Sequence, residues 1–309
     1  MENKASITAL MSSFGRAFHT ENEEHPVFCD ALARELMTDE EYTAVQGYIL
    51  GGAQFFEPEI VASEQEPKEL LRRLVNVHIA PSPLCRTAYT ERVLKAEALN
   101  GTEQYVILGA GLDTFAFRET EFLSKHRCLR RIIRLRRRTS WSELRAPAGR
   151  SPKILNLFLW ISQKTACPSA CLPEALISPK NPFSRVTYYL SVEAIEQTLS
   201  ALSELCAPGS SLVFDYPDEN FFAAAEKRVQ NTIMMAKAGG EAMQSAFSCA
   251  ELEKLLQNHG FQIRELLTPA DIQRNIIDRA GASMKAFEHV NYCHAAKHVG
   301  KTNEIETSN

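Results

Sequence analysis

Residues 105–114, Tyr-Val-Ile-Leu-Gly-Ala-Gly-Leu-Asp-Thr, decide the fold of this chain. The apolar run predicts a buried strand of a parallel sheet, and it breaks directly into two glycines. Gly109 and Gly111 have no Cβ, so a ligand can approach the main chain at the carboxyl end of the strand. The stretch predicts a nucleotide-binding turn. A tight strand-to-helix turn without a ligand is the alternative.

The spacing of the glycines narrows the choice of ligand. A dinucleotide fingerprint requires a third glycine three residues after the second, and Thr114 stands at that place. The acid expected about twenty residues further on is not visible either. An oxidoreductase that uses NAD or NADP is therefore the alternative interpretation of the turn.

A longer stretch around the turn resembles a known family. Val-Ile-Leu-Gly-Ala-Gly-Leu-Asp-Thr-Phe-Ala-Phe-Arg, residues 106–118, is similar to the S-adenosylmethionine loop of the leucine carboxyl methyltransferase-like family. That family contains class I methyltransferases acting on carboxylates and hydroxyls. Other stretches look like its amino-terminal helices and the ends of its fourth and fifth strands: Thr8–Leu10, Arg16–His19, Phe28–Asp30, Ala80–Thr87, Val186–Ser191 and Val213–Asn220.

The resemblance implies an α/β fold, a doubly wound, mostly parallel, seven-stranded Rossmann-like sheet with an N-terminal helical cap and an antiparallel last strand. The alternation of strand and helix patterns predicts a parallel, doubly wound sheet independently. We expect one domain over residues 1–309, with the cap at 1–100, the core at 101–300 and a disordered tail at 301–309. Helices are expected at 5–20, 28–50, 66–78, 84–99, 192–205, 221–237 and 249–259, and later strands at 211–215, 261–267 and, as an edge strand, 289–297.

The resemblance also implies which residues bind S-adenosyl-L-methionine: Arg86, Gly109, Ala110, Gly111, Asp113 and Val186. Arg86 matches the arginine that pairs with the methionine carboxylate of the cofactor, a task suited to a guanidinium group. An ordinary surface arginine is the alternative. Asp113 is expected beside the loop, or as a cap of the helix that follows.

No catalytic residue can be assigned from the sequence. Methyl transfer from an activated sulfonium depends mainly on positioning, and a carboxylate acceptor needs no base, whereas a phenol or alcohol does. Asp215 could be that base or could cap Asn220 or the helix after it, and His19 is no better determined. Tyr188 and Tyr189 could line the acceptor pocket or belong to the core. Arg16 and His19 share a helix face that could form a lid or face solvent.

The composition changes abruptly within residues 126–185. This segment has thirteen Lys or Arg against two acids and contains both tryptophans, and with a whole-chain charge of −4 the remainder has −15. One explanation is a basic nucleic-acid-binding arm, because Arg127–Arg138 contains seven arginines in twelve residues. We favour another explanation, a coding sequence of the family translated in a shifted reading frame.

Codon structure supports the shifted frame. Tryptophan has the single codon TGG and isoleucine codons begin with AT, so reading one base earlier across Trp160-Ile161 forces GAT, aspartate. The shift permits Val-Asp-Phe there and Asp-His-Pro across Arg131–Arg134, the motifs of the family after its third and second strands. These acids bind the adenine amine and the ribose hydroxyls in the family. Their loss predicts impaired activity or a non-catalytic remnant, and an irregular segment between two packed blocks.

The remaining features suggest a cytoplasmic enzyme acting on a small-molecule methyl acceptor. The N-terminus has no signal-peptide pattern, and the longest apolar stretch, near Ile154–Ile161, is too short to cross a bilayer. Eight scattered cysteines lack paired metal-ligand spacing. We therefore expect no metal, no nucleic acid and no membrane partner.

Overall fold

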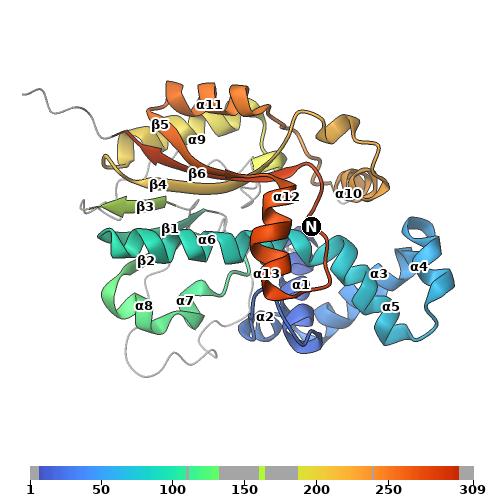
Figure 1. The fold of residues 1–309 in the computed structure, drawn as a ribbon. Coiled ribbons are helices and arrows are strands. Elements are labelled where there is room, and N and C mark those ends of the chain that lie inside the picture. The colour runs from blue at the N-terminus through green and yellow to red at the C-terminus, as the bar shows by residue number, and fades with distance from the viewer. Residues whose placement is uncertain (1–6, 109–110, 132–159, 164–186, 239, 299–309) are drawn as a thin grey trace, which may run out of the picture.

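The computed structural model describes residues 7–108, 111–131, 160–163, 187–238 and 240–298. Its described strands form one sheet in the order β2-β1-β3-β4-β6-β5 (Figure 1). The strands are β1 (Thr102–Leu108), β2 (Arg127–Arg131), β3 (Trp160–Gln163), β4 (Ser211–Pro217), β5 (Phe261–Leu267) and β6 (Val290–Lys297).

The strand directions differ from the sequence expectation of a mostly parallel, seven-stranded sheet. The described residues contain six strands, and of their pairings only β1 with β2 is parallel. The expected antiparallel last strand is confirmed, because β6 pairs antiparallel with β4. It is not an edge strand, since β5 pairs with its other side. The largest departure is β3, which runs antiparallel to both β1 and β4.

Two of these strands come from the basic segment of residues 126–185. The expectation of an irregular segment is therefore wrong for β2 and β3, which join the sheet. A short strand can pair with a sheet even when the strand has no apolar face, because the pairing depends on main-chain hydrogen bonds alone. The attachment of β3 to β4 covers only Trp160 opposite Leu212 and Ile161 opposite Ser211. The rest of the segment lies outside the described residues.

Residues 7–99 form helices, as the sequence predicted, although the expected helix 28–50 begins only at Leu32 and is interrupted before Asp39. Their starts have recognisable signals: Thr38 and Glu41 form a capping box, and Pro58, Pro67 and Pro81 occupy first-turn positions where a missing N–H costs nothing. The helices are α1 (Ile7–Asn22), α2 (Leu32–Glu35), α3 (Asp39–Phe56), α4 (Pro58–Ser63), α5 (Pro67–Leu74), the π-helical turn η1 (Val75–Ile79) and α6 (Pro81–Leu99).

The later elements also follow the sequence closely. Ser191 and Ser248 cap α9 and α11 by accepting a hydrogen bond from a backbone N–H three residues ahead. The expected helix 221–237 is split into a 3₁₀ turn and α10. The elements are α7 (Phe115–Arg118), α8 (Thr120–Lys125), η3 (Thr187–Tyr189), α9 (Val192–Leu205), η4 (Phe221–Ala223), α10 (Lys227–Ala238), α11 (Cys249–Asn258), α12 (Pro269–Ile272), η5 (Gln273–Ile277) and α13 (Asp278–Ala280).

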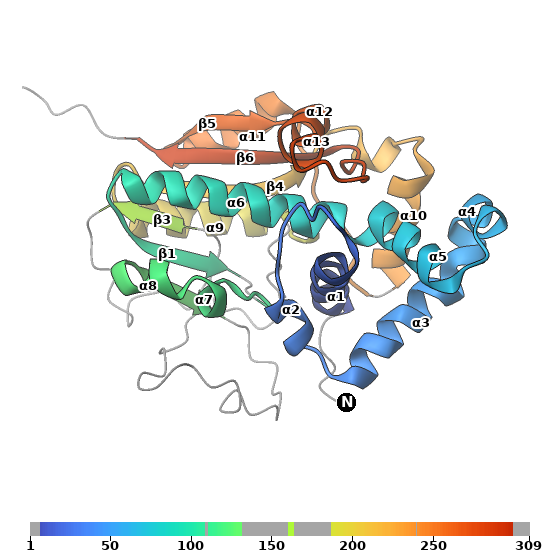
Figure 2. The same cartoon turned by 60° about the horizontal axis from the view of Figure 1, so that its bottom comes forward.

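Strand β1 is apolar on both faces because helices cover both sides of the sheet. Tyr105 and Ile107 belong to the core on the α6 side, whereas Val106 and Leu108 belong to the core that includes α9 and α11. Figure 2 shows α6 across one face of the sheet, with α9 and α11 behind the other. This two-sided burial explains the continuous apolar run that the sequence shows before the glycine turn.

Among the described residues, no helix combines the length and the apolar character that crossing a membrane requires.

Candidate functional site

The turn after β1 places a glycine where the backbone requires one. Gly111 has a φ of +47°, a left-handed conformation that residues with a Cβ rarely adopt. Two residues later, the carboxylate of Asp113 accepts a hydrogen bond from the backbone N–H of Phe115 at 2.9 Å. Asp113 is thus buried beside the loop and accepts from the first residue of α7, although the N-cap position itself is Thr114, which makes no side-chain cap hydrogen bond. Gly109 and Ala110 lie outside the described residues, as does Val186.

Arg86 extends from α6 to the end of β4 and forms an ion pair with Asp215. Its Nη1 lies 2.5 Å from Oδ2 of Asp215, whose side chain is fully buried. Burial lowers the pKa of Arg86, but the Asp215 carboxylate raises it by more. The net effect is a raised pKa, so the guanidinium group stays charged. The buried Nε of Arg86 has no hydrogen-bond partner among the described residues. The surface-arginine interpretation of Arg86 is therefore wrong.

A pocket of about 490 Å³, including its open mouth, lies where α6, β1 and β4 meet. Arg86 and Asp113 both line it, together with Leu108 at the end of β1 and Val213 and Phe214 of β4. The structure thus brings together two residues that the resemblance assigned to the cofactor. The pocket fits the methionine end of S-adenosylmethionine, because Arg86 has a buried donor left over for a carboxylate.

Tyrosines surround this ion pair on the side of η3. Burial raises the pKa of Tyr188 well above its usual range, and burial raises the pKa of Tyr189 to about 12. Both phenols are therefore protonated at neutral pH. Nearby, Thr8 at the start of α1 donates a hydrogen bond to Glu241. Tyr188 belongs to the core, as one interpretation of the sequence had it, and Tyr189 is partly buried.

Arg16 and His19 do not face solvent, so that interpretation is wrong. Arg16 is buried, pairs with the fully buried Asp30, and donates through Nη2 to the carbonyl oxygen of Leu112 at 2.7 Å. His19 is buried too, and burial lowers its pKa. Its Nε2 accepts the backbone N–H of Val27. Helix α1 is therefore fastened to the residues that follow the glycine turn.

Asp30 is the centre of this attachment, and the sequence singled it out only as part of the family resemblance. The hydroxyl of Thr114 donates to Oδ2 of Asp30 at 2.7 Å. Arg118 lies 3.6 Å from the other oxygen of Asp30 and also pairs with Glu91 of α6. One buried cluster, which we call the Asp30 cluster (Arg16, Asp30, Thr114, Arg118 and Glu91), thus joins α1, α6 and α7 around the turn.

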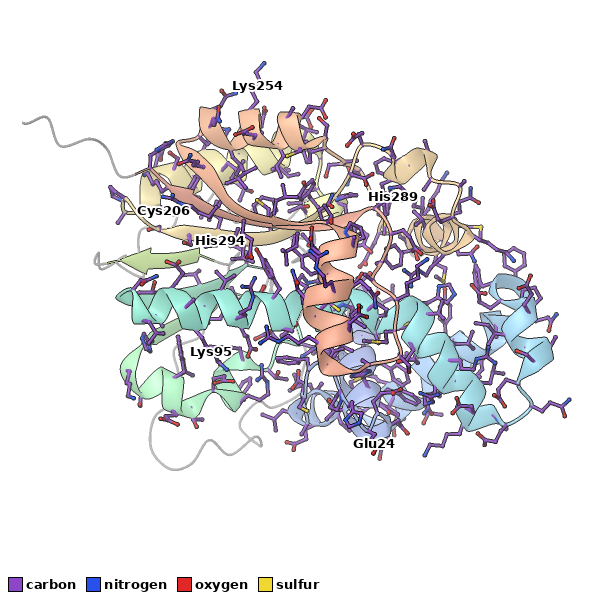
Figure 3. The ribbon with its side chains drawn as sticks, viewed as in Figure 1. Glu24, Lys95, Cys206, Lys254, His289 and His294 are labelled. Atoms are coloured by element: carbon purple, nitrogen blue, oxygen red, sulfur yellow. The ribbon has the colours of Figure 1, made fainter. Side chains whose placement is uncertain are left out.

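Asp215 does not cap Asn220. The backbone N–H of Asn220 instead donates to Oδ1 of Asp218 at 2.9 Å. Asp218 also contacts Nδ1 of His289, which precedes β6 (Figure 3). Asp215 is therefore a partner of Arg86, and neither a cap nor a base is needed to explain its position. Within the described ranges, no three His, Cys, Asp or Glu side chains are grouped so that they could hold a metal ion.

Comparison with known proteins identifies the family of this chain. The model of the leucine carboxyl methyltransferase family matches residues 9–127. A protein of Bacillus subtilis (strain 168), YktD, whose name is that of an S-adenosyl-L-methionine-dependent methyltransferase, is 34% identical over 301 residues, which cover 96% of this chain and 99% of YktD. The chain belongs to the leucine carboxyl methyltransferase-like family. It is an S-adenosylmethionine-dependent methyltransferase, and the oxidoreductase alternative is not favoured.

A solved structure shows a more distant likeness to this chain. The crystal structure of Burkholderia thailandensis 1,6-didemethyltoxoflavin-N1-methyltransferase, with 1,6-didemethyltoxoflavin and S-adenosylhomocysteine bound, is 13% identical to this chain. The match has a TM-score of 0.39 and covers 85% of this chain and 91% of that one.

Proposed function

We propose that the chain transfers the methyl group of S-adenosylmethionine to an oxygen of a small molecule, a carboxylate or a hydroxyl. The observation that supports it most is the family match over residues 9–127, which includes Arg16, Asp30, Arg86 and the glycine turn. These are the residues from which the described part of the site is built. The chain would act as one domain, with residues 1–100 covering a core at 101–300.

In this proposal the cofactor lies across the carboxyl ends of β1 and β4. Arg86 would hold its methionine carboxylate, and the backbone of Gly109, Ala110 and Gly111 would leave room beside it, with Asp113 fixing the turn and Val186 at the next strand end. Bound S-adenosylmethionine supplies a methyl group on an already activated sulfonium. The Asp30 cluster holds the turn in place from outside, so that the residues touching the cofactor need not move on binding.

The side chains at the described part of the site orient an acceptor more readily than they deprotonate one. The Asp215 carboxylate is engaged by Arg86, and the raised pKa of the partly buried Tyr189 keeps its phenol as a hydrogen-bond donor. Donors beside a fixed guanidinium suit an acceptor oxygen that already has negative charge. A carboxylate is therefore favoured over an alcohol.

We also propose that residues 126–185 are the product of a shifted reading frame that leaves this chain a poor enzyme. The family match ends at residue 127, one residue after the change in composition begins. Of the two described pieces of the segment, β3 supports it further, because β3 is antiparallel to both of its neighbours, whereas β2 pairs parallel with β1. The basic nucleic-acid arm is the other interpretation.

Transfer of tritium from methyl-labelled S-adenosylmethionine to a panel of small carboxylic and phenolic acceptors tests the reaction. Methyl esters release volatile methanol in base and methyl ethers do not, so a base step identifies the acceptor oxygen. We expect base-labile product that Arg86→Met abolishes. Arg92→Met is the matched control, since Arg92 is an exposed arginine of the same helix. Label on nitrogen or carbon only would contradict the proposal.

A further inference from the structure

A second pocket lies away from the cofactor, between α1, α3, η1 and α10. It has about 370 Å³, including its mouth, and shares no lining residue with the pocket at Arg86. Its wall is apolar except for His78 and the hydroxyl of Tyr48, and Tyr48 at its rim is half exposed. An apolar wall with few polar groups is the usual character of a ligand pocket.

Helix α3 keeps this pocket open with a glycine. Gly52 lies in the interior of the helix, where glycine costs about 1 kcal/mol relative to alanine. A Cβ at this position would lie 3.0 Å from the ring of Phe56, another residue of the pocket wall. Gly52 thus leaves space in the pocket wall at a position where a residue such as alanine would stabilise the helix.

His78 presents an unused acceptor in this wall. Its Nε2 lies 2.9 Å from Oε1 of Glu57, and a carboxylate can only accept, so Nε2 has the proton. Burial lowers the pKa of His78 despite the opposing effect of Glu57, which keeps the imidazole neutral. Nδ1 is then a bare acceptor. It is buried and has no hydrogen-bond partner among the described residues, and the side chain is only 8% exposed.

The backbone that holds His78 is unusual. Residues 75–79 form a π-helical turn, in which the N–H of Ala80 donates to the carbonyl oxygen of Val75 at 2.8 Å. Such turns are rare and occur frequently at functional sites. A buried acceptor left without a partner costs about 1–3 kcal/mol, so a π-helical turn that holds one in a pocket wall needs an explanation.

We propose that this pocket binds an apolar molecule with one hydroxyl group, which donates its O–H to Nδ1 of His78. The carbon skeleton of the ligand lies against Ile49, Phe56 and Leu74. The small volume selects a single ring or a short chain, such as a simple phenol. The inference does not depend on methyl transfer, because the pocket and the imidazole are independent of the cofactor site.

Calorimetric titration with p-cresol and p-xylene tests the hydrogen bond, since the two probes have the same shape and differ by a hydroxyl. We expect His78→Phe to weaken p-cresol binding roughly two- to tenfold, the equivalent of one hydrogen bond, and to leave p-xylene within about twofold. His294→Phe is the matched control. His294 is a histidine of β6 whose pKa burial also lowers, and its Nε2 contacts Ser211 (Figure 3).

A second variant tests the location of the ligand without touching His78. Gly52→Leu fills the pocket and replaces a poor helix former with a good one, so we expect a folded protein that binds neither probe. The proposal is overturned by an absence of saturable p-cresol binding to the unaltered chain, by an equal effect of His78→Phe on both probes, or by full binding to Gly52→Leu.

Discussion

Strands β1 and β2 are parallel neighbours, but different residues follow their carboxyl ends. After β1 come the left-handed Gly111 and the buried Asp113. The strand β2 ends at Arg131, and the sequence continues through Ile132 and Ile133 without an acid before Glu143. Nucleotide ribose is usually held by an acid at such a strand end. In the proposed cofactor site, one side therefore has its residues and the other lacks its carboxylate.

The largest effect should come from supplying that carboxylate. A version whose gene is read one base earlier between about codons 126 and 185 gains an aspartate in place of Trp160-Ile161, and its codons permit a second across Arg131–Arg134. Each lost charge-assisted hydrogen bond costs about 1.5–3 kcal/mol, so restoration should raise methyl transfer at low cofactor by roughly two to four powers of ten. Tritium transfer at equal folded concentration measures the difference. Equal rates would mean that residues 126–185 are a genuine adaptation.

On the β4 side, removing the partner of Arg86 should have the next largest effect. Asp215→Ala leaves a buried guanidinium without its carboxylate, and we expect a loss of about 3–5 kcal/mol in the free energy of unfolding. Urea titration measures it. The control is Glu265→Ala, which removes the partner of the exposed Arg92 and should cost under about 1 kcal/mol. Similar losses in the free energy of unfolding for both variants would show that the buried Arg86–Asp215 pair contributes no more to stability than the exposed pair.

The glycine turn itself should respond to a change in the Asp30 cluster. Arg16→Met removes the donor to Leu112 and the partner of Asp30, and we expect S-adenosylhomocysteine affinity to fall about tenfold because the turn loses its outer support. Arg16→Lys should recover part of the loss. Arg228→Met is the control, since Arg228 is also buried and pairs with Glu288 away from the turn. An equal loss of affinity in Arg228→Met would indicate general destabilisation.

The smallest effect concerns His289, beyond the end of β4. Partial burial lowers its pKa, but Asp218 and Glu226 outweigh this and the pKa of His289 is raised. A raised pKa gives stability that is present below the unfolded value of about 6.5 and is lost as pH rises through the folded value. His289→Gln should therefore be less stable than the unaltered chain at about pH 5.5, and the gap should narrow at about pH 8.5. Chemical unfolding at both pH values checks it. A gap that widened with pH would contradict the assignment.

Local patterns in the sequence predicted the elements that local physics controls. The apolar run and the glycines located β1 and its turn, and helical periodicity with capping residues located α1, α9 and α11. Pairings across long sequence separations were not predictable, because nothing at Arg86 indicates Asp215, 129 residues later. The same holds for Asp30 and Thr114. The direction of β3 also escaped prediction, since a four-residue strand has too little pattern to fix one.

Calorimetry with S-adenosylhomocysteine and NAD, on the chain as written and on the frame-restored version, tests the central claim most directly. The account predicts that the restored protein binds S-adenosylhomocysteine at least a hundredfold more tightly than the chain as written. This factor is roughly the smallest loss of affinity expected from two missing charge-assisted hydrogen bonds. The account also predicts that neither protein prefers NAD. Micromolar S-adenosylhomocysteine binding by the chain as written would contradict the claim that the acid binding the cofactor ribose is missing. Equal or stronger binding of NAD by either protein would contradict the account of the glycine turn.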